Sequence, residues 1–233
     1  MPRQDDLATR AFEPEELLGP LNDVERKYAP KQLFASGRVD LLRERARVAI
    51  VGTRRPTADG EKRARRLARI LVRERVVVVS GLAEGIDTIA HRTAIAEGGD
   101  TIAVIGTPLA RAYPRSNAAL QQYMSEHQLV VTQFGPRAAV RRASFPLRNR
   151  TMALISHVSV IVEAGEGSGS LSQGWEALRL GRKLFILRST VENASLTWPR
   201  KMLEHGAEVL AQPDQILTEL PPPSYWDAAD APF

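Results

Sequence analysis

The sequence predicts an α/β fold: a doubly wound, mostly parallel sheet of the extended Rossmann-like type, within a single domain. Short apolar runs rich in β-branched residues alternate with helical patterns through the central part of the chain. Strands that are buried on both faces have this nearly continuous apolar character. Strict alternation of such strands with helices is typical of a parallel sheet covered on both faces.

The first half of the expected fold follows this alternation segment by segment. The first strand is expected at "RVAIVG" (47–52), a β-branched run that ends in glycine. The next segment, 58–75, has the helical period and an outer face of arginine and lysine. A second strand is expected at "VVVVSG" (76–81), a helix closed by a glycine pair at 85–98, and a third strand at "TIAVIG" (101–106).

The second half continues the pattern. A helix is expected at "SNAALQQYMSEH" (116–127), with Ser116 or Asn117 as its N-cap. Three further strands are expected at 129–134, 158–164 and 183–187. Helical patterns lie among them at 146–156, 171–181 and 198–206.

The ends of the chain differ in composition from this regular part. Residues 1–30 are polar and acidic in patches and contain Pro14, Pro20 and Pro30, so we expect a loose N-terminal arm. The Rossmann-like domain is expected to span 31–220. The last segment, 221–233, reads "PPPSYWDAADAPF" and is expected to be a poorly ordered tail.

Composition excludes several classes of protein. The chain has 233 residues, of which 43% are hydrophobic and 25% charged, which is typical of a globular protein. No apolar run approaches the ~20 residues that cross a bilayer, so no membrane association is expected. The lack of cysteine excludes disulfides and thiolate zinc sites, and a cytoplasmic location is the simple inference. The net charge of +5 suits a polyanionic partner, although an arginine-rich proteome produces the same charge.

The segment "GTRRP" follows the first expected strand. Gly52 would let a ligand or a helix approach the backbone, and Thr53, Arg54 and Arg55 would lie at the carboxyl edge of the sheet. The alternative is a plain strand–helix turn with exposed arginines. The segment is not a dinucleotide-binding fingerprint, because the G-x-G-x-x-G pattern is absent.

The segment "SGLAEGID" follows the second strand. Ser80, Gly81 and Gly85 flank a turn into a helix whose N-terminal amides would form an anion site at the same edge. Asp87 is equally well placed to cap that helix. His91 lies one turn further on, and we expect it to be packed and hydrogen-bonded.

The segment "EAGEGSGSLSQ" predicts a further phosphate-binding loop. It places small residues between a buried strand and a helix, namely Gly167, Ser168, Gly169 and Ser170. It is not a Walker A loop, because the Gly-Lys-Ser/Thr ending is missing. No nucleophilic triad and no metal-ligand cluster occurs in the sequence. This edge therefore predicts a binding protein without catalytic residues, metal or cofactor.

The segment "SFPLRNRTMALIS" places an aromatic ring and two arginines at the start of an apolar helix. Phe145, Arg148, Asn149 and Arg150 together are suited to hold an anion and a flat ring. An aromatic face stacks on any base, and arginines follow a phosphate backbone. The alternatives are core packing for Phe145 and a salt bridge for Arg150 to a carboxylate at the sheet edge such as Glu163.

Five collinear motifs over roughly 28–210 resemble the DNA-processing protein A (DprA, or Smf) family. They are "VAIVGTRRPT", the stretch from "VVVVSGLAEG" to "TIAVIG", "YPRSN", "FPLRNR", and the stretch from "VIVEAGEGSGS" to "GRKLF". The resemblance implies a dimeric Rossmann-like protein that binds single-stranded DNA without strong sequence preference. It also implies protection of incoming single strands and help in loading the recombinase RecA during natural transformation. By position, the residues of the single-strand groove are Arg54, Arg142, Phe145, Arg148, Asn149 and Arg150.

The chain departs from the family pattern at several places. Thr132-Gln133 replaces a common Ser-Glu, "GTPLARAYP" replaces a glycine-rich turn, and "RSTVENASLTWPRK" replaces a Pro-Gly stretch after 183–187. The additional terminal domains of many relatives are absent from this sequence, so the resemblance implies a minimal member with the Rossmann-like domain alone.

Two other functions remain open at this stage. One is a nucleotide-sensing domain that uses the same edge of the sheet. The other is a nucleoside monophosphate phosphoribohydrolase of the lysine-decarboxylase-like group, whose catalytic glutamate would align with Gln173 in this chain. An amide cannot act as a carboxylate acid or base, which disfavours the hydrolase.

Overall fold

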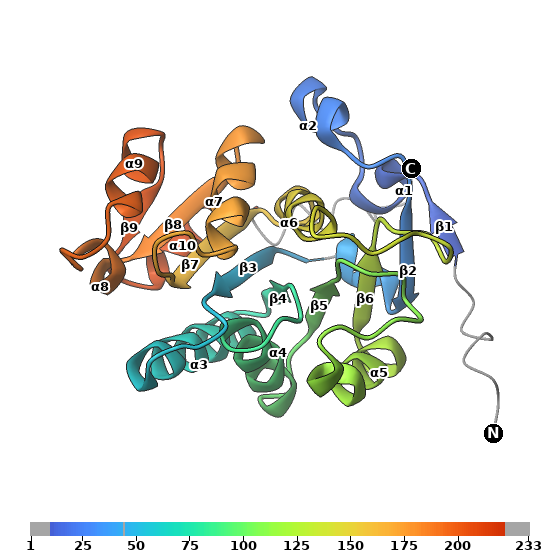
Figure 1. Ribbon diagram of the computed structural model, residues 1–233, viewed down its shortest axis with the longest axis horizontal. Coiled ribbons are helices and arrows are strands. Elements are labelled where there is room, and N and C mark those ends of the chain that lie inside the picture. The colour runs from blue at the N-terminus through green and yellow to red at the C-terminus, as the bar shows by residue number, and fades with distance from the viewer. Residues whose placement is uncertain (1–9, 44, 222–233) are drawn as a thin grey trace.

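The structure, a computed structural model, describes residues 10–43 and 45–221 (Figure 1). A single nine-stranded sheet has the order β1-β2-β6-β5-β4-β3-β7-β8-β9. The strands are β1 (Arg10–Phe12), β2 (Leu33–Gly37), β3 (Arg47–Gly52), β4 (Val77–Ser80), β5 (Thr101–Val104), β6 (Leu129–Thr132), β7 (Val158–Glu163), β8 (Lys183–Leu187) and β9 (Glu208–Leu210). The pairs from β6 to β9 are parallel, whereas β1 pairs antiparallel with β2 and β2 antiparallel with β6. The predicted fold class is therefore confirmed.

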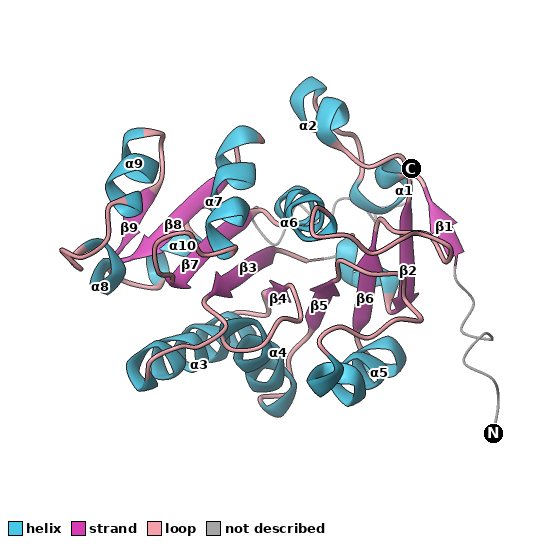
Figure 2. Cartoon of the chain, in the orientation of Figure 1, coloured by secondary structure: helices cyan, strands magenta, loops and turns pink. Residues whose placement is uncertain are grey.

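The helices cover both faces of this sheet (Figure 2). They are α1 (Pro14–Leu18), α2 (Asp23–Tyr28), α3 (Ala58–Arg73), α4 (Ile86–Ala96), α5 (Ala118–His127), α6 (Ser144–Ile155), α7 (Ser170–Arg179), α8 (Arg188–Val191), α9 (Trp198–Glu204) and α10 (Asp214–Leu217), with short 3-10 helices at η2 (Val39–Leu42) and η3 (Arg115–Asn117). Helices α3, α4 and α5 lie on one face, and α6 and α7 on the other (Figure 1).

The strand residues alternate between two cores, one on each face of the sheet. Val48 and Ile50 of β3 pack with α3 and α4, whereas Ala49 and Val51 pack with α6 and α7 on the opposite face. All four side chains are buried. This two-sided burial explains why the strand reads as an unbroken apolar run in the sequence.

The six predicted strands are present, but several are shorter at their carboxyl ends than expected. Gly81 and residues 105–106 belong to loops, because the chain leaves the sheet there to form the edge described below. Asn117 stands at the N-cap position of α5 without capping it through its side chain, which donates to the carbonyl of Leu82 instead (3.0 Å).

The prediction of a loose N-terminal arm is wrong for residues 10–28. This segment adds β1 to the sheet and places Phe12, Leu17 and Leu21 in the larger core. Pro14 lies in the first turn of α1, where a missing amide proton costs nothing, and so it does not indicate disorder. Asn22 and Glu25 form a capping box at α2. The expected tail lies, apart from Pro221, outside the described residues.

The order of the strands reverses next to β3. The chain passes from β3 through α3 to β4 on one side, whereas β7 lies on the other side of β3 and continues to β8. The loops that follow β3 and β7 therefore diverge from neighbouring strand ends. In parallel sheets this divergence opens a crevice where ligands bind.

Replacing Leu17 tests whether the N-terminal segment belongs to the fold. Leu17 is 1% exposed in the main core, so Leu17→Ala should lower the free energy of unfolding by about 2–5 kcal/mol in chemical denaturation. Val24→Ala is the matched control, because Val24 is 45% exposed and its truncation should change stability by less than about 0.5 kcal/mol. Equal, small effects of both changes would show that the segment is not packed in solution.

Candidate nucleic-acid interface

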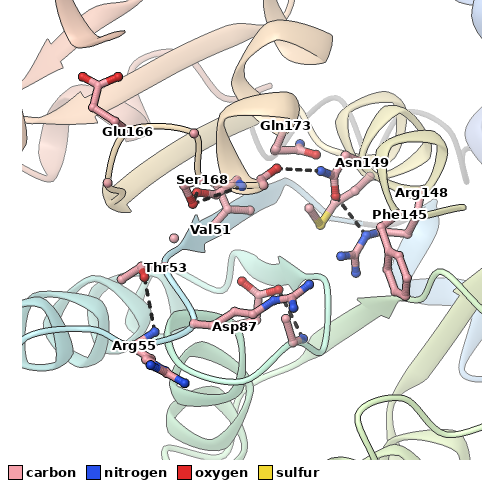
Figure 3. Close-up of a pocket in the computed structure, with 18 residues that line it drawn as sticks. Val51, Thr53, Arg55, Asp87, Phe145, Arg148, Asn149, Glu166, Ser168 and Gln173 are labelled. Atoms are coloured by element: carbon pink, nitrogen blue, oxygen red, sulfur yellow. Dashed lines mark hydrogen bonds between the residues drawn. The ribbon is translucent and has the colours of Figure 1, made fainter. Parts of the chain in front are cut away.

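A cavity of about 550 Å³ lies at the carboxyl ends of β3 and β7 (Figure 3). Four parts of the chain enclose it: the loop after β3, the segment with Ala83 and Asp87 at the start of α4, the start of α6, and the loop from Gly165 to Ser170 before α7. It thus occupies the crevice at the point where the strand order reverses. The predicted site residues that line it are Gly52, Thr53, Arg54, Arg55, Phe145, Arg148, Asn149, Gly167, Ser168, Gly169 and Ser170.

The loop after β3 requires glycine at position 52. A Cβ there would lie 2.6 Å from the side chain of Ile86 and 2.8 Å from the carbonyl oxygen of Glu163, so α4 and β7 approach the bare backbone. The amide of Thr53 donates to that same carbonyl (2.7 Å). Arg54 and Arg55 then project from the loop as exposed side chains. Neither forms an ion pair with any described residue, which leaves their charge available to a ligand.

The glycine-rich loop after β7 faces open space. A Cβ at Gly165, Gly167 or Gly169 would meet no atom within 4 Å, and Gly167 has a left-handed φ of +70°. The hydroxyls of Ser168 and Ser170 contact each other at 2.8 Å (Figure 3). The loop therefore presents small side chains and backbone at the start of α7, the arrangement that suits a phosphate.

Glu166 belongs to the cavity lining, but its carboxylate, together with a downstream segment, braces this loop. The Glu166 carboxylate accepts from the amides of Thr197 and Trp198 at the start of α9, and the first of these hydrogen bonds lowers its pKa. The indole of Trp198 donates to the carbonyl of Ala164 (3.2 Å), and the Thr190 hydroxyl to that of Val162 (2.9 Å). The segment after β8, where the chain departs from the family pattern, thus supports the end of β7.

Arg148 lies at the bottom of the site and is only 7% exposed. Its guanidinium donates to the carbonyls of Gly81 and Val104 (2.8 Å to the latter) and to the side chain of Asn149 (2.9 Å). Asn149 in turn donates to the carbonyl of Gly169 (3.2 Å). These hydrogen bonds join α6 to the ends of β4 and β5 and to the glycine-rich loop. Arg148 was predicted to contact DNA; its Nε and Nη1 donors are used within the protein, and its side chain lines the cavity.

The charge of Arg148 is matched by a buried carboxylate. Asp87 is 6% exposed and accepts from the amide of Ala83 (3.3 Å), so it does not cap α4 as considered from the sequence. Burial raises the pKa of Asp87, and the nearby Arg148 opposes that rise. Burial likewise lowers the pKa of Arg148, with Asp87 opposing. Each group thus favours the charged form of the other, against the larger effect of burial.

His91 is packed and hydrogen-bonded, as predicted. It is fully buried in α4, and its Nδ1 lies 2.7 Å from the Thr101 hydroxyl. Burial, with a smaller effect of Arg148, lowers the pKa of His91 to about 3, so the ring is neutral at physiological pH.

Phe145 lies half-buried at the mouth of the cavity. One side of its ring packs on the backbone of Gly106, where a Cβ would come within 2.9 Å of the ring carbon Cδ1. The ring of Tyr113 lies beside it, with 5.2 Å between centroids. Phe145 is therefore held in place by the protein while it still borders open space (Figure 3).

Three candidates from "SGLAEGID" do not line the main cavity. The Ser80 hydroxyl is fully buried and donates to the carbonyl of Ile50 (2.6 Å). Gly81 carries the carbonyl that Arg148 binds, and Gly85 has a φ of +75° where the backbone passes the loop after β3. The first amide of α4, that of Ile86, donates to the carbonyl of Thr53 (3.2 Å). The expected anion site at this helix start is therefore already occupied by the protein's own backbone.

Arg142 and Arg150 also lie outside the cavity lining. Arg142 is exposed in the segment before α6. Arg150 binds the carboxylate of Glu176 on α7 (2.9 Å) and lies over the ring of Tyr28 from α2 (5.2 Å). A salt bridge was the alternative considered for Arg150, but its partner is Glu176. Glu163 instead accepts from the amide and hydroxyl of Thr57 at the start of α3 (2.9 and 2.6 Å).

Two further features, a metal-ligand cluster and a membrane-spanning helix, are absent from the described residues. No group of three or more His, Asp or Glu side chains within the described residues could hold a metal ion. None of the helices that the structure describes is long and apolar enough to cross a membrane.

The fold and the cavity define an extended Rossmann-like domain with a basic, glycine-rich pocket at the reversal of strand order. Within that class, the chain belongs to the family of DNA recombination-mediator protein A, whose model matches residues 15–221. It is similar to the DNA processing protein DprA of Bacillus subtilis, with 35% identity over 82% of this chain and 65% of the relative. It is also similar to the protein Smf of Escherichia coli, with 33% identity over 87% of this chain and 54% of the relative. The chain thus spans between half and two thirds of these relatives.

Solved structures of the family have the same fold. DNA processing protein A from Streptococcus pneumoniae superposes with a TM-score of 0.78 at 32% identity, over 92% of this chain and 75% of that one. The protein from Helicobacter pylori, whose structure describes a single-stranded DNA binding mode, superposes with a TM-score of 0.75 at 27% identity. That match covers 91% of this chain and 95% of the other.

The contacts of Arg150 predict a structural role. Arg150→Ala removes the closer of two arginine partners of Glu176, whose side chain is 10% exposed and which keeps Arg179 at 3.7 Å, and should lower the free energy of unfolding by about 1–3 kcal/mol. The salt dependence of DNA binding should stay unchanged. Arg200→Ala is the control, because that arginine is 88% exposed and pairs only with Glu204 at the surface, so its loss should be nearly neutral. If Arg150→Ala instead makes the salt dependence of DNA binding shallower and leaves stability unchanged, Arg150 contacts DNA and the structural role is wrong.

Proposed function

We propose that this chain binds single-stranded DNA without strong sequence preference. The observation that carries the proposal is the combination, in one cavity, of a half-buried aromatic ring and two arginines that have no ion-pair partner among the described residues. Phe145 offers its face to a base, Arg54 and Arg55 neutralise the adjoining phosphates, and the loop from Gly165 to Ser170 adds backbone and hydroxyl groups. Membership of the recombination-mediator family and the single-strand binding described for the Helicobacter pylori relative support the proposal.

The shape of the cavity favours single strands over duplex. A base has to leave its stack before its face can meet Phe145, and in a duplex this costs a few kcal/mol of unpairing and unstacking. A flexible single strand can turn one base into a cavity of about 550 Å³ at much lower cost.

The wider role follows from the family: the bound strand would be incoming DNA that is protected and passed to RecA, with the protein acting as a homodimer. The cytoplasmic location inferred from composition stays a prediction.

The proposed role is binding and not catalysis. Gln173, at the position of the catalytic glutamate of the phosphoribohydrolases, is fully buried. In the orientation that satisfies its amide, it donates to the carbonyl of Asn149 (2.6 Å) and accepts from the Ser159 hydroxyl (3.2 Å). A carboxylate there would face the carbonyl oxygen of Asn149. Gln173 therefore supports α6 and is not available to a substrate.

A nucleotide-sensing function is the second candidate, because the volume of the cavity lies in the range of small-molecule sites. Length dependence distinguishes it from strand binding. A strand-binding site should bind oligothymidylate far more tightly than deoxythymidine monophosphate, because further phosphates and bases add contacts. A sensor should bind the monophosphate best and gain nothing from added length.

Phe145→Ala tests the stacking contact. The variant should bind a 20-residue oligothymidylate about 1–3 kcal/mol more weakly, the contribution of one stacked base, with unchanged salt dependence. Wild type should prefer this strand to a duplex of equal length, and Phe145→Tyr should retain its affinity. Fluorescence anisotropy measures these affinities, and melting curves measure the stability of each variant. Equal affinity of the wild type for duplex and single strand would sink the proposal, and a collapsed melting temperature in Phe145→Ala would identify the ring as core.

Arg54→Ala tests the phosphate contact. If Arg54 neutralises one phosphate, the slope of log affinity against log salt should become shallower by about 0.7 in magnitude. The loss should be equal for oligothymidylate and a mixed sequence, and Arg54→Lys should restore the charge but not a bidentate contact. Arg200→Ala serves again as the exposed control and should keep the wild-type slope. An unchanged slope for Arg54→Ala would remove this arginine from the site.

A further inference from the structure

A second aromatic side chain, Tyr113, lies next to Phe145 at the edge of the cavity. The two ring centroids are 5.2 Å apart and the rings are tilted by 44°. Tyr113 is 46% exposed, which makes it one of the most exposed large apolar side chains among the described residues. Its loop connects β5 to α5, and the sequence suggested no role for this tyrosine. An aromatic face that is open to solvent beside a proposed stacking residue calls for a functional explanation.

Tyr113 borders a small cavity that adjoins the main one. This cavity has a volume of about 60 Å³, and its lining includes Gly81, Glu84 and Pro114. Arg54, Phe145 and Arg148 line both cavities, so the ring of Phe145 stands at the boundary between them. The space is too small to enclose a nucleobase. A base would instead lie across its mouth, against the exposed ring of Tyr113.

Glu84 makes the Tyr113 side of the small cavity less favourable to a phosphate, whereas Arg54 and the buried Arg148 line its boundary with the main cavity. Glu84 is exposed at the rim of the small cavity and accepts from the Ser116 hydroxyl (2.8 Å). A carboxylate repels a phosphate, whereas the uncharged face of a base can pack on the tyrosine. Positive charge lies further along the same loop, on the exposed Arg111 and Arg115, neither of which pairs with a described carboxylate. A strand that places a base on Tyr113 can therefore direct its phosphates to Arg54 on one side and to these arginines on the other.

The loop that carries Tyr113 is held by side-chain hydrogen bonds at three points. The Thr107 hydroxyl donates to the carbonyl of Arg111 (2.6 Å), and the Gln121 amide to that of Leu109 (2.8 Å). Asn117 binds the carbonyl of Leu82 (3.0 Å) and the hydroxyl of Thr88 (2.8 Å). A ring on a preorganised loop loses little conformational entropy when a ligand stacks on it.

We infer that Tyr113 is a second base-stacking residue, and that the surface between Tyr113 and Phe145 receives the base next to the one in the main cavity. This inference rests on the proposed single-strand binding and deepens it: the site holds two consecutive nucleobases, each on its own aromatic ring, with Arg54 at the phosphate between them.

The test compares ligands of different length with variants of two tyrosines. Tyr113→Leu keeps an apolar contact to Phe145 but removes the aromatic face, whereas Tyr113→Phe keeps the face. Tyr123→Leu on α5 is the matched control, because Tyr123 is a tyrosine of similar exposure (41%) outside both cavities. Calorimetric titrations with deoxythymidine monophosphate, trithymidylate and a 20-residue oligothymidylate, beside melting curves, give the affinities.

We expect Tyr113→Leu to weaken the binding of both oligonucleotides about 5- to 150-fold, the effect of one lost stacking contact, and to leave the binding of the monophosphate unchanged. Tyr113→Phe and Tyr123→Leu should bind like wild type. If Tyr113→Leu binds the oligonucleotides normally, the inference is wrong while single-strand binding stands. If Tyr113→Leu weakens the binding of the monophosphate equally, Tyr113 acts only by positioning Phe145. That result also overturns the inference of a second base site. Failure of the wild type to bind oligothymidylate would instead refute the proposed function itself.

A second measurement needs no variant. Two trinucleotides are compared, which carry the fluorescent base 2-aminopurine at one or the other of two adjacent positions. The fluorescence of both should be quenched on binding to the wild-type protein. Quenching at one position alone would contradict two consecutive stacking sites.

Discussion

The buried guanidinium of Arg148 is the interaction on which the site depends. It draws the carbonyl groups at the ends of β4 and β5 toward the start of α6, and through Asn149 it reaches the glycine-rich loop. An arginine that is 7% exposed is tolerable only because Asp87 supplies the opposite charge and backbone carbonyls accept its protons. The ring of Phe145, three residues earlier on the same helix, is thereby fixed at the mouth of the cavity.

Two further carboxylates complete this framework. Glu163 ties the end of β7 to the start of α3, and Glu166 ties the glycine-rich loop to the start of α9. Both satisfy amides at the first turn of a helix, where a negative charge is favoured. The acidic side chains near the site are therefore turned toward the protein's own backbone. Two acidic residues, Asp87 and Glu166, line the main cavity: Arg148 compensates the first, and the amides of Thr197 and Trp198 bind the second.

The arginines of this edge divide into two groups according to their partners. Arg148 and Arg150 are bound by carbonyls and by Glu176, and they stabilise the fold. Arg54 and Arg55 have no carboxylate partner among the described residues and extend from a loop whose backbone is fixed by Gly52 and Thr53. Arg54 and Arg55, like the exposed Arg111 and Arg115, are able to exchange counterions for a bound polyanion. The half-buried ring of Phe145 and the exposed ring of Tyr113 add uncharged surface beside them.

By itself, the sequence determined six of the nine strands and the place of the site. Those six strands are mostly apolar runs, a local property, and loops after neighbouring strands must meet at one edge, so Gly52 to Arg55 and Gly167 to Ser170 were predicted to converge. Tertiary structure alone decided which arginine is free and which is bound, because Arg148 and Arg54 are the same residue type and their partners lie far away in the chain. It also decided that residues 10–28 belong to the fold, since the pairing of β1 with β2 is too short to produce a periodic pattern. Tyr113 acquires its neighbour Phe145 only when the loop after β5 folds against α6, a contact between residues that no local pattern connects.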